Sequence, residues 1–541
     1  MNTNLPLLSI LTFVPLVLAL IVLALPKDNV KNIKLVAFAG TIITLVLSIV
    51  IWTMYAPHSG GTGPDAPYQF TERFSWIPEL HVNYFLGVDG ISLLMVLMTT
   101  GIFPFVVGVS FGSITKRVKE YYFWVLVMET AILGVFLSLN LVLFYIFWEA
   151  MLIPAYFIIG IWGGPKRIYA TIKFFLYTMV GSMVMLVSIL GLYYVTGAKT
   201  FDLPELITAA PAALSGHLTT EILLFIGFFL AFGIKAPIWP FHTWVPDAYS
   251  EAPTGGTIIL VALKMGLYGF IRFCLPLFPN AVHTVGPIII VLSVIGVIYA
   301  AFVASVQSDL KRLLAYSSVS HVGVIMLAIF GVSAIGINGA LLQMASHTIT
   351  TGALFIIVGG LYARRKSYAI ADYGGLMSIM PTFTFVFLIA TLSSVALPLT
   401  SGFSGEILML VGSFRNYPIA TAFATTAAIW SVVYMLWMFQ RVMHGPLDKE
   451  ENKSLPDITF GEKWALYPLV VLIFVLGIVP NIALSRTDPS VDTVLQQYKT
   501  GLYTDVTTGR LPSGTRVITV APVRVAFGSS LHTISLKGDR E

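Results

Sequence analysis

Long apolar runs alternate with short polar segments along almost the whole chain. Crossing the ~30 Å hydrocarbon core of a bilayer takes about 20 helical residues, and most of the runs reach that length. None shows the ~10-residue alternating repeat of a membrane β-strand, so the pattern predicts helices. We expect fourteen spans, near residues 6–25, 33–54, 90–112, 122–138, 141–161, 172–195, 221–239, 256–277, 285–306, 314–331, 338–362, 379–410 (broken), 419–441 and 465–484.

Two stretches lack a spanning pattern. Residues 55–88 form a loop rich in proline, glycine and aromatic residues, and residues 485–541 form a polar tail in which 516–529 alternates weakly, as a hairpin does. The pattern therefore divides the chain into an N-terminal three-helix region, two five-helix units, a connecting loop with the last helix, and the tail. These regions cover residues 1–112, 113–280, 281–445, 446–484 and 485–541.

Composition supports the membrane assignment. Of the 541 residues, 57% are hydrophobic and 11% are charged, whereas a soluble domain carries roughly a quarter charged residues. The net charge of +5 is scattered over loops, so no nucleic-acid partner is expected. A single cysteine, Cys274, excludes a disulfide framework, a cysteine-ligated zinc site and a four-thiolate iron–sulfur cluster within this chain.

Positive charges set the expected orientation. Lys27, Lys31 and Lys34 follow the first span instead of preceding it, which argues against a cleaved signal and places the N-terminus outside. With fourteen spans, eighteen Lys and Arg residues then fall in inside loops and four (Arg73, Lys199, Arg272 and Arg415) in outside loops or span ends. This asymmetry predicts that both termini, and the loop 55–88, lie outside.

Ionisable residues occur within the predicted spans, where a charge costs from ~3 to more than 10 kcal/mol at mid-bilayer. Any one of them alone fits a structural role equally well, such as a snorkelling lysine or a hydrogen-bonded core histidine. Together they span six or seven helices and favour a path for protons or cations, because buried Lys, Glu and His change protonation when a partner moves. The set comprises Glu129, Glu149, Lys235, Lys264, His321, His347 and Glu406.

Two of these groups lie beside predicted helix breaks. Pro237 and Pro240 follow Lys235 and lack the amide donor that a helix needs, while Pro398 precedes Glu406 on a later span. The two breaks are five spans apart, and an odd number of helices inverts the second unit relative to the first. Inverted repeats with broken helices at the bilayer midplane are typical of transport folds. We therefore predict an all-α polytopic membrane protein with two inverted five-helix repeats, each containing a broken helix.

The residues around these positions carry a family resemblance over roughly residues 80–480. The chain resembles the membrane subunits shared by NADH:quinone oxidoreductase (respiratory complex I) and the Mrp antiporters, and in its FWE element it looks most like the subunit M family. The long central block is highly specific to this superfamily. The matching segments are YFLGVDGIS (84–92), FWEAMLIP (147–154), KRIYATIKFFLYTMVGS (166–182), 235–273, SDLKRLLAYSSVSHVG (308–323) and SGFSGE (401–406).

The resemblance implies proton translocation and assigns roles to the buried set. Glu149 and Lys235 look like the family's Glu–Lys pair, and Lys264 looks like its central lysine. His321 and His347 look like the relay histidines, and Glu406 looks like the terminal acid beside the next subunit. Glu129 matches a carboxylate that is common in the family, and His242 matches a histidine near the cytoplasmic side. Asp247 and Glu251 belong to the same motif, where loop hydrogen bonding is expected.

Two positions depart from the family pattern. The family usually has glycine after the proline of the second broken helix, where this chain has Leu399. Either Gly402 and Gly405 supply the backbone freedom there, or the break is shifted along the chain. The tail beyond residue 485 is also longer than the family's usual end, and it could pack on the outer face or on a neighbouring subunit.

Several functions share these motifs. The favoured one is a proton-translocating membrane-arm subunit of NADH:quinone oxidoreductase in a bacterial inner membrane, with NADH, flavin, iron–sulfur clusters and quinone in partner subunits and no cofactor in this chain. Its partners would be other membrane-arm subunits, including neighbouring antiporter-like ones, and the lipid bilayer. An Mrp-type sodium/proton antiporter subunit and an antiporter-like subunit of a membrane-bound hydrogenase remain open. A passive anchor is disfavoured by the intact Glu149 and Lys235, and a haem–copper oxidase by too few histidines within spans.

Overall fold

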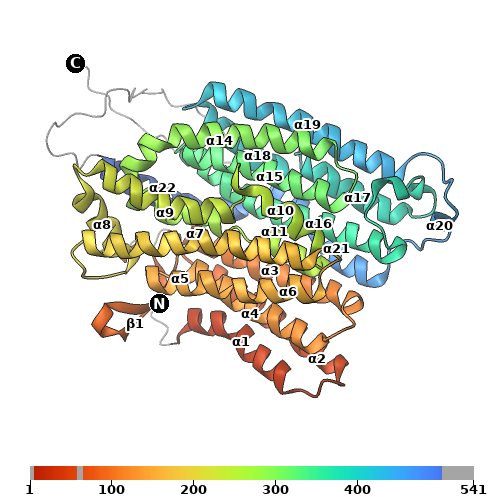
Figure 1. Ribbon diagram of the computed structural model, residues 1–541, viewed down its shortest axis with the longest axis horizontal. Coiled ribbons are helices and arrows are strands. Elements are labelled where there is room, and N and C mark those ends of the chain that lie inside the picture. The colour runs from red at the N-terminus through yellow and green to blue at the C-terminus, as the bar shows by residue number, and fades with distance from the viewer. Residues whose placement is uncertain (1–4, 58–64, 503–541) are drawn as a thin grey trace, which may run out of the picture.

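Apolar runs form helices that lie side by side along the longest axis of the molecule (Figure 1). The computed structural model describes residues 5–57 and 65–502. Among these residues, thirteen helices are long and apolar enough to cross a membrane. The predicted span 379–410 is not among the thirteen, because it consists of two helices of 14 residues each, Pro381–Ser394 and Ser401–Phe414. The prediction of a polytopic helical membrane protein with a broken helix there is confirmed.

The N-terminal helices lie at one edge of the bundle, at the bottom of Figure 1. The first two contact each other and the fourth, and two thirds of each of their spanning windows is not buried by the rest of the chain. Surfaces of this kind face lipid or another subunit. The elements are α1 (Leu7–Ala24), α2 (Val30–Met54), α3 (Gly90–Ser113) and α4 (Val118–Leu137).

The predicted loop 55–88 contains a β-hairpin. Strand β1 (Gln69–Ile77) pairs antiparallel with β2 (Val82–Val88) around the short helix η1 (Pro78–Leu80). Asp202, whose side chain is fully buried, accepts hydrogen bonds of 2.6 Å each from Arg73 and Asn83 of the hairpin and from Asn140. Asn140 in turn caps the next helix, so this carboxylate ties the hairpin to the bundle.

The predicted span 141–161 is two helices, α5 (Leu141–Ala150) and α6 (Leu152–Trp162), joined at Met151. Pro154 sits in the first turn of α6, where its missing amide proton costs little. Downstream, α9 ends at Lys235, so the helix breaks at the two prolines that follow it, as predicted, and the short helices η2 and α10 come next. These elements are α7 (Arg167–Val195), α8 (Leu203–Leu214), α9 (Leu218–Lys235), η2 (Phe241–Trp244) and α10 (Val245–Glu251).

The next span is interrupted by a break that the sequence did not predict. Residues 254–277 are divided into α11 (Thr254–Ala262), α12 (Met265–Gly269), the π-helical turn η3 (Phe270–Cys274) and α13 (Leu275–Leu277). Lys264 stands at the junction of the first two pieces, which contains neither proline nor glycine. Almost the whole segment is buried inside the bundle, so neighbouring helices hold this irregular backbone.

The second half is built around α16, whose central spanning window is entirely buried. Helix α18 packs along α16 through Gly339, Gly405 and Gly412, where any Cβ atom would lie within 2.5 Å of the facing backbone or side chain. These elements are α14 (Pro279–Ser305), α15 (Leu310–Phe330), α16 (Ala334–Arg365), η4 (Ile370–Asp372), η5 (Leu376–Ser378), α17 (Pro381–Ser394), α18 (Ser401–Phe414), α19 (Pro418–Met443), α20 (Glu450–Lys453) and α21 (Phe460–Ile478). The inversion between the two five-helix units stays a prediction.

The segment that the sequence assigned to the start of a polar tail is a helix, α22 (Asn481–Leu502). It buries one apolar face against α3, α13 and α16. Ser490 Oγ accepts a hydrogen bond of 2.9 Å from the amide of Gly90, and Thr487 Oγ1 donates one of 2.9 Å to Asn338. Its overall polarity concealed this face in the sequence. The hairpin predicted at 516–529 lies outside the described residues.

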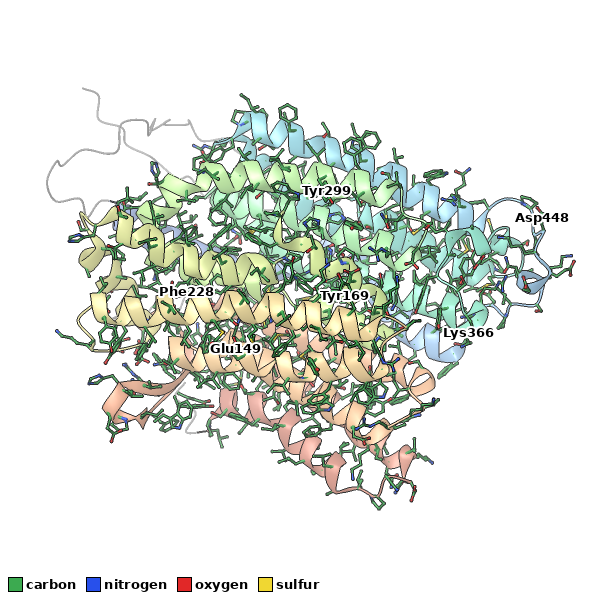
Figure 2. All side chains as sticks on the ribbon, in the orientation of Figure 1. Glu149, Tyr169, Phe228, Tyr299, Lys366 and Asp448 are labelled. Atoms are coloured by element: carbon green, nitrogen blue, oxygen red, sulfur yellow. The ribbon has the colours of Figure 1, made fainter. Side chains whose placement is uncertain are left out.

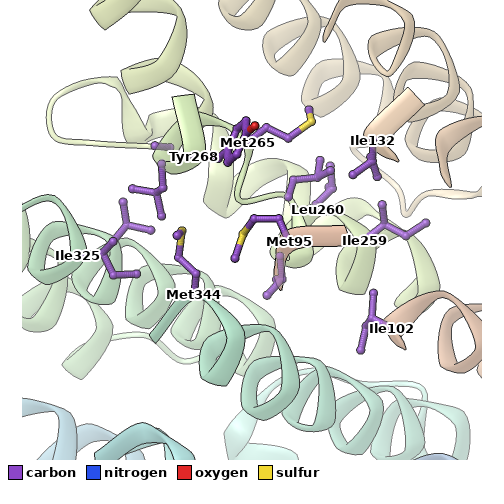
Figure 3. Close-up of a cluster of buried hydrophobic side chains, with 14 of the residues drawn as sticks. Met95, Ile102, Ile132, Ile259, Leu260, Met265, Tyr268, Ile325 and Met344 are labelled. Atoms are coloured by element: carbon purple, nitrogen blue, oxygen red, sulfur yellow. The ribbon is translucent and has the colours of Figure 1, made fainter. Parts of the chain in front are cut away.

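Apolar side chains fill the centre of the bundle. Figure 3 shows Met95, Met265, Ile325 and Met344 gathered in one cluster that joins four different elements. Met265 follows Lys264 directly, and Met344 lies one turn from His347. The buried ionisable groups are therefore embedded in closely packed hydrocarbon, which raises the cost of any charge that is not paired or hydrated.

A buried chain of ionisable groups

The first pair, Glu149 and Lys235, lies beside the α5–α6 junction. Lys235 at the end of α9 is 4% exposed, with Nζ 2.6 Å from Sδ of Met151 and 5.0 Å from the centroid of the Trp148 ring. Glu149 interacts with it electrostatically, but no direct ion pair joins them in the described part of the chain. Figure 2 places Glu149 between the ends of the bundle, whereas Lys366 and Asp448 lie at one end.

The second group joins three elements. Nζ of Lys264, at the unpredicted break, lies 3.1 Å from Nδ1 of His347 on α16, and the rings of His347 and His321 on α15 are 5.7 Å apart. An ammonium donates and a neutral imidazole nitrogen accepts, so a proton held at Lys264 can be shared with His347. The buried Nε2 of His347 has no hydrogen-bond partner among the described residues.

The third group surrounds the second predicted break. Hydroxyls of α16 meet those beside the break: Ser346 donates to Ser401 at 2.8 Å, and Thr350 lies 2.8 Å from Ser393. Glu406 is one turn further along α18 and only partly exposed. Contacts of α12 with α9, of α15 with α16 and of α16 with α18 place Lys264 and the two histidines between α9, which ends at Lys235, and α18, which carries Glu406.

Sequence reasoning missed several polar residues here. Ser393, Ser401 and Tyr434 had no distinguishing pattern, because hydroxyls in spans also serve helix packing. Gln343 was missed as well, although it lies four residues before His347 and therefore on the same face of α16. A Cβ atom on Gly405 would lie 2.5 Å from its Oε1, and this oxygen has no partner in the described part of the chain.

Within the described residues, Glu129 and His242 form no hydrogen bond or ion pair with the other members of this chain of groups. Glu129 on α4 is fully buried, and neither carboxylate oxygen has a hydrogen-bond partner among the residues described. His242 in η2 packs its ring against Tyr299 at 5.3 Å and Tyr316 at 6.4 Å, and its Nδ1 is likewise unpartnered there. Their roles in proton transfer stay predictions.

Asp247 and Glu251 take part in polar contacts near the loop, as expected. Asp247 in α10 forms ion pairs with Lys173 at 2.7 Å and Arg312 at 3.4 Å, and Glu251 accepts a hydrogen bond of 2.8 Å from the amide of Lys166.

Arg272 differs from its predicted place at an outer span end. It is 3% exposed inside η3 and paired with the buried Asp89 at the N-terminus of α3.

The alternative in which glycines supply the backbone freedom of the second break is wrong. Positive φ angles occur at Ala396 (56°) and Leu399 (76°), between α17 and α18. Gly402 and Gly405 instead lie inside α18, where they allow close approach to the Ser393 carbonyl and to Gln343. Leu399 therefore occupies the backbone conformation that favours the family's glycine.

Comparison with known proteins gives the family. The model of the NADH:quinone oxidoreductase/Mrp antiporter transmembrane family matches residues 138–431. The NADH-quinone oxidoreductase subunit M of Rhodobacter capsulatus is 42% identical over 512 residues, which cover 92% of this chain and 98% of that protein. This chain belongs to the subunit M family of NADH-quinone oxidoreductases.

Solved structures agree with this family assignment. A chain of respiratory complex I from Thermus thermophilus is 30% identical, with a TM-score of 0.80 over 91% of this chain and 99% of that one. A chain of an archaeal membrane-bound sulfane sulfur reductase is 26% identical, with a TM-score of 0.76 over 88% of this chain and 76% of that one. Sequence identity thus shows the subunit M family, and the fold over most of the chain is shared with chains of complex I and of a related archaeal complex.

Proposed function

We propose that this chain translocates protons across a bacterial inner membrane as a membrane-arm subunit of NADH-quinone oxidoreductase, with both termini outside. NADH oxidation and quinone reduction would take place in partner subunits, which would hold the flavin and iron–sulfur clusters. The observation that carries the proposal is the 3.1 Å contact of Lys264 with His347, buried beside His321 between two helix breaks. Ionisable groups in such places mark ion pathways.

The geometry supports a stepwise transfer. Moving Glu149 towards Lys235 favours the ammonium, and separating them favours release of its proton, because a nearby opposite charge stabilises the charged form. A proton released from Lys235 would reach Lys264 through water, since no direct contact joins the two lysines in the described part of the chain. Lys264 would share it with the histidine pair, from which it would move on to Glu406.

The test uses the assembled complex in liposomes. Lys235→Ala and Glu149→Gln are each expected to reduce NADH-driven proton translocation at least tenfold and to suppress quinone reduction, because one member of the pair is lost. Lys463→Ala, at the exposed start of α21, is the matched control and should leave both activities unchanged. Wild-type proton transport by the Lys235→Ala complex would overturn the central role of that lysine.

Partner composition separates this function from the antiporter alternatives. Native purification in mild detergent should bring down flavin and iron–sulfur subunits with NADH-driven quinone reduction. Identity of 42% to a subunit M over 98% of its length favours this outcome. Recovery of small membrane subunits alone, with sodium-dependent proton exchange, would transfer the same residues to an Mrp-type antiporter, and co-purifying hydrogenase subunits would indicate a membrane-bound hydrogenase.

A further inference from the structure

A tyrosine on a peripheral helix makes a buried hydrogen bond in the middle of the second half. The hydroxyl of Tyr434 on α19 donates to Oγ of Ser317 on α15 at 2.9 Å. Tyr434 is 1% exposed and Ser317 is 3% exposed, although only a third of the spanning window of α19 is buried. A buried polar contact that an outer helix directs into the bundle is a candidate functional feature.

The two ends of this hydroxyl pair face the two groups that the path must connect. Ser317 lies four residues before His321 on α15, so the two side chains share one face, with Cβ atoms about 5–6 Å apart. At the other end, the Tyr434 hydroxyl is close enough to Glu406 to interact with it electrostatically. The order His321, Ser317, Tyr434, Glu406 therefore crosses the bundle from α15 through α19 to α18.

The other hydroxyls near the break do not offer the same connection. Ser346 and Ser401 are hydrogen-bonded beside His347, but Ser401 precedes Glu406 by five residues. Five residues correspond to about 140° around an α-helix, which directs the two side chains to different faces of α18. The Ser401 group thus joins α16 to the start of α18, whereas Tyr434 approaches the face that carries the carboxylate.

We infer that Ser317 and Tyr434 relay protons between His321 and Glu406. A proton leaves a nitrogen of the His321 imidazolium for Ser317 Oγ, directly or through one water. The Ser317 hydroxyl proton passes to the Tyr434 oxygen, and the Tyr434 proton passes to the carboxylate of Glu406. Three N–H or O–H bonds break and three O–H bonds form, so His321 becomes neutral, Glu406 becomes neutral, and both hydroxyls are regenerated. The transfer leaves Tyr434 donating to Ser317, which is the orientation seen here. Rotation of the two hydroxyls then restores the starting orientation, in which Ser317 donates to Tyr434 and Tyr434 donates to Glu406.

The inference rests on the proposed function, and its test uses the same assembled complex in liposomes. Tyr434→Phe removes one oxygen and keeps the ring. The matched control is Tyr121→Phe, because Tyr121 is also fully buried, and its hydroxyl lies 2.9 Å from Oγ of Ser110 on α3. Both variants lose one buried tyrosine–serine hydrogen bond, so their melting temperatures should fall by similar amounts.

Proton translocation per NADH oxidised is the deciding readout. Tyr434→Phe and Ser317→Ala are expected to lower it at least threefold, Ser317→Thr should restore it because it keeps a hydroxyl, and Tyr121→Phe should leave it unchanged. Unchanged translocation in both Tyr434→Phe and Ser317→Ala overturns the relay. An equal loss in Tyr121→Phe also overturns it, since the effect would then be structural. If Lys235→Ala abolishes translocation while Tyr434→Phe does not, the relay fails and the proposed function stands.

Discussion

At the scale of single residues, the backbone of the second break adopts a conformation that its residues disfavour. Leu399 has φ of 76° and a side chain that is 64% exposed, so it makes few contacts that offset the unfavourable conformation. For an L-residue other than glycine this region costs roughly 1–2 kcal/mol. The break near Glu406 is therefore held by its surroundings rather than by local preference.

Leu399→Gly is expected to stabilise the protein. Relief of the left-handed conformation outweighs the entropy that glycine loses on folding, which is about 0.5–1 kcal/mol, and leaves a net gain of up to about 1 kcal/mol. The melting temperature of the purified protein in detergent measures this gain. A lower melting temperature would mean that the exposed leucine makes a stabilising contact in the assembly.

Gly405→Ala should have the opposite effect. Its Cβ would lie 2.5 Å from Oε1 and 2.8 Å from the backbone nitrogen of Gln343, so α16 and α18 must separate, at a cost of about 1–3 kcal/mol. Gly101→Ala is the control, because that helical position has open space around its Cβ. Thermal unfolding of both variants checks the prediction, and equal stability would contradict close packing at Gly405.

At the scale of elements, the position of each helix end determines where the chemistry can occur. α9 ends at Lys235, α11 ends beside Lys264, and α17 ends before the loop that leads to Glu406. The start of α17 is held from outside by Asp457, whose carboxylate accepts hydrogen bonds from the amides of Thr382 at 3.2 Å and Phe383 at 2.9 Å. Desolvation raises the pKa of Asp457, but these amides and that of Ile458 outweigh it and hold the pKa below its usual value.

This cap makes the start of α17 sensitive to pH. Because the folded pKa of Asp457 is depressed, its contribution is present above the unfolded pKa and is lost as pH falls through the folded pKa. Asp457→Ala should lower the free energy of local opening by about 1 kcal/mol. This change corresponds to roughly fivefold faster amide exchange at Thr382 and Phe383. Hydrogen exchange followed by mass spectrometry measures the change at several pH values.

The exposed Asp448, in the same connecting region, provides the control for this measurement. Asp448→Ala should leave exchange at the start of α17 unchanged at every pH. The cap would be refuted if exchange in Asp457→Ala matched the wild type at neutral pH. It would also be refuted if the difference between them failed to shrink on acidification.

At the scale of the whole molecule, a buried ion pair joins segments far apart in the chain. Arg272 of η3 donates to Asp89, which also caps α3 by accepting from the amide of Ser92. Tyr268 accepts from Nε of Arg272 at 3.2 Å and donates to the carbonyl of Phe136 on α4 at 3.1 Å. The pair thus connects α3, α4 and the irregular span that carries Lys264.

Removing one partner of this pair should be costly. Arg272→Met leaves the Asp89 carboxylate buried without its cation and is expected to destabilise the protein by about 3–5 kcal/mol. Adding Asp89→Asn keeps an acceptor for the cap and removes the charge, so the double variant should recover part of the loss. Chemical denaturation in detergent gives both values. Strict additivity of the two substitutions would contradict a direct interaction.

Membrane class, the places of the thirteen spanning helices and the two proline-flanked breaks could be predicted from the sequence, because hydropathy and missing amide donors are local properties of the chain. The ionisable residues within spans could be identified for the same reason, because a side chain is titratable in any conformation. They are Glu149, Lys235, Lys264, His321, His347 and Glu406.

The arrangement of these residues in space could not be predicted in this way. The contact of Lys264 with His347, the Tyr434–Ser317 bond, the burial of Arg272 and the packing of α22 each join residues more than eighty positions apart. Only tertiary packing decided them, because such contacts depend on how helices fit together and not on the preferences of either segment.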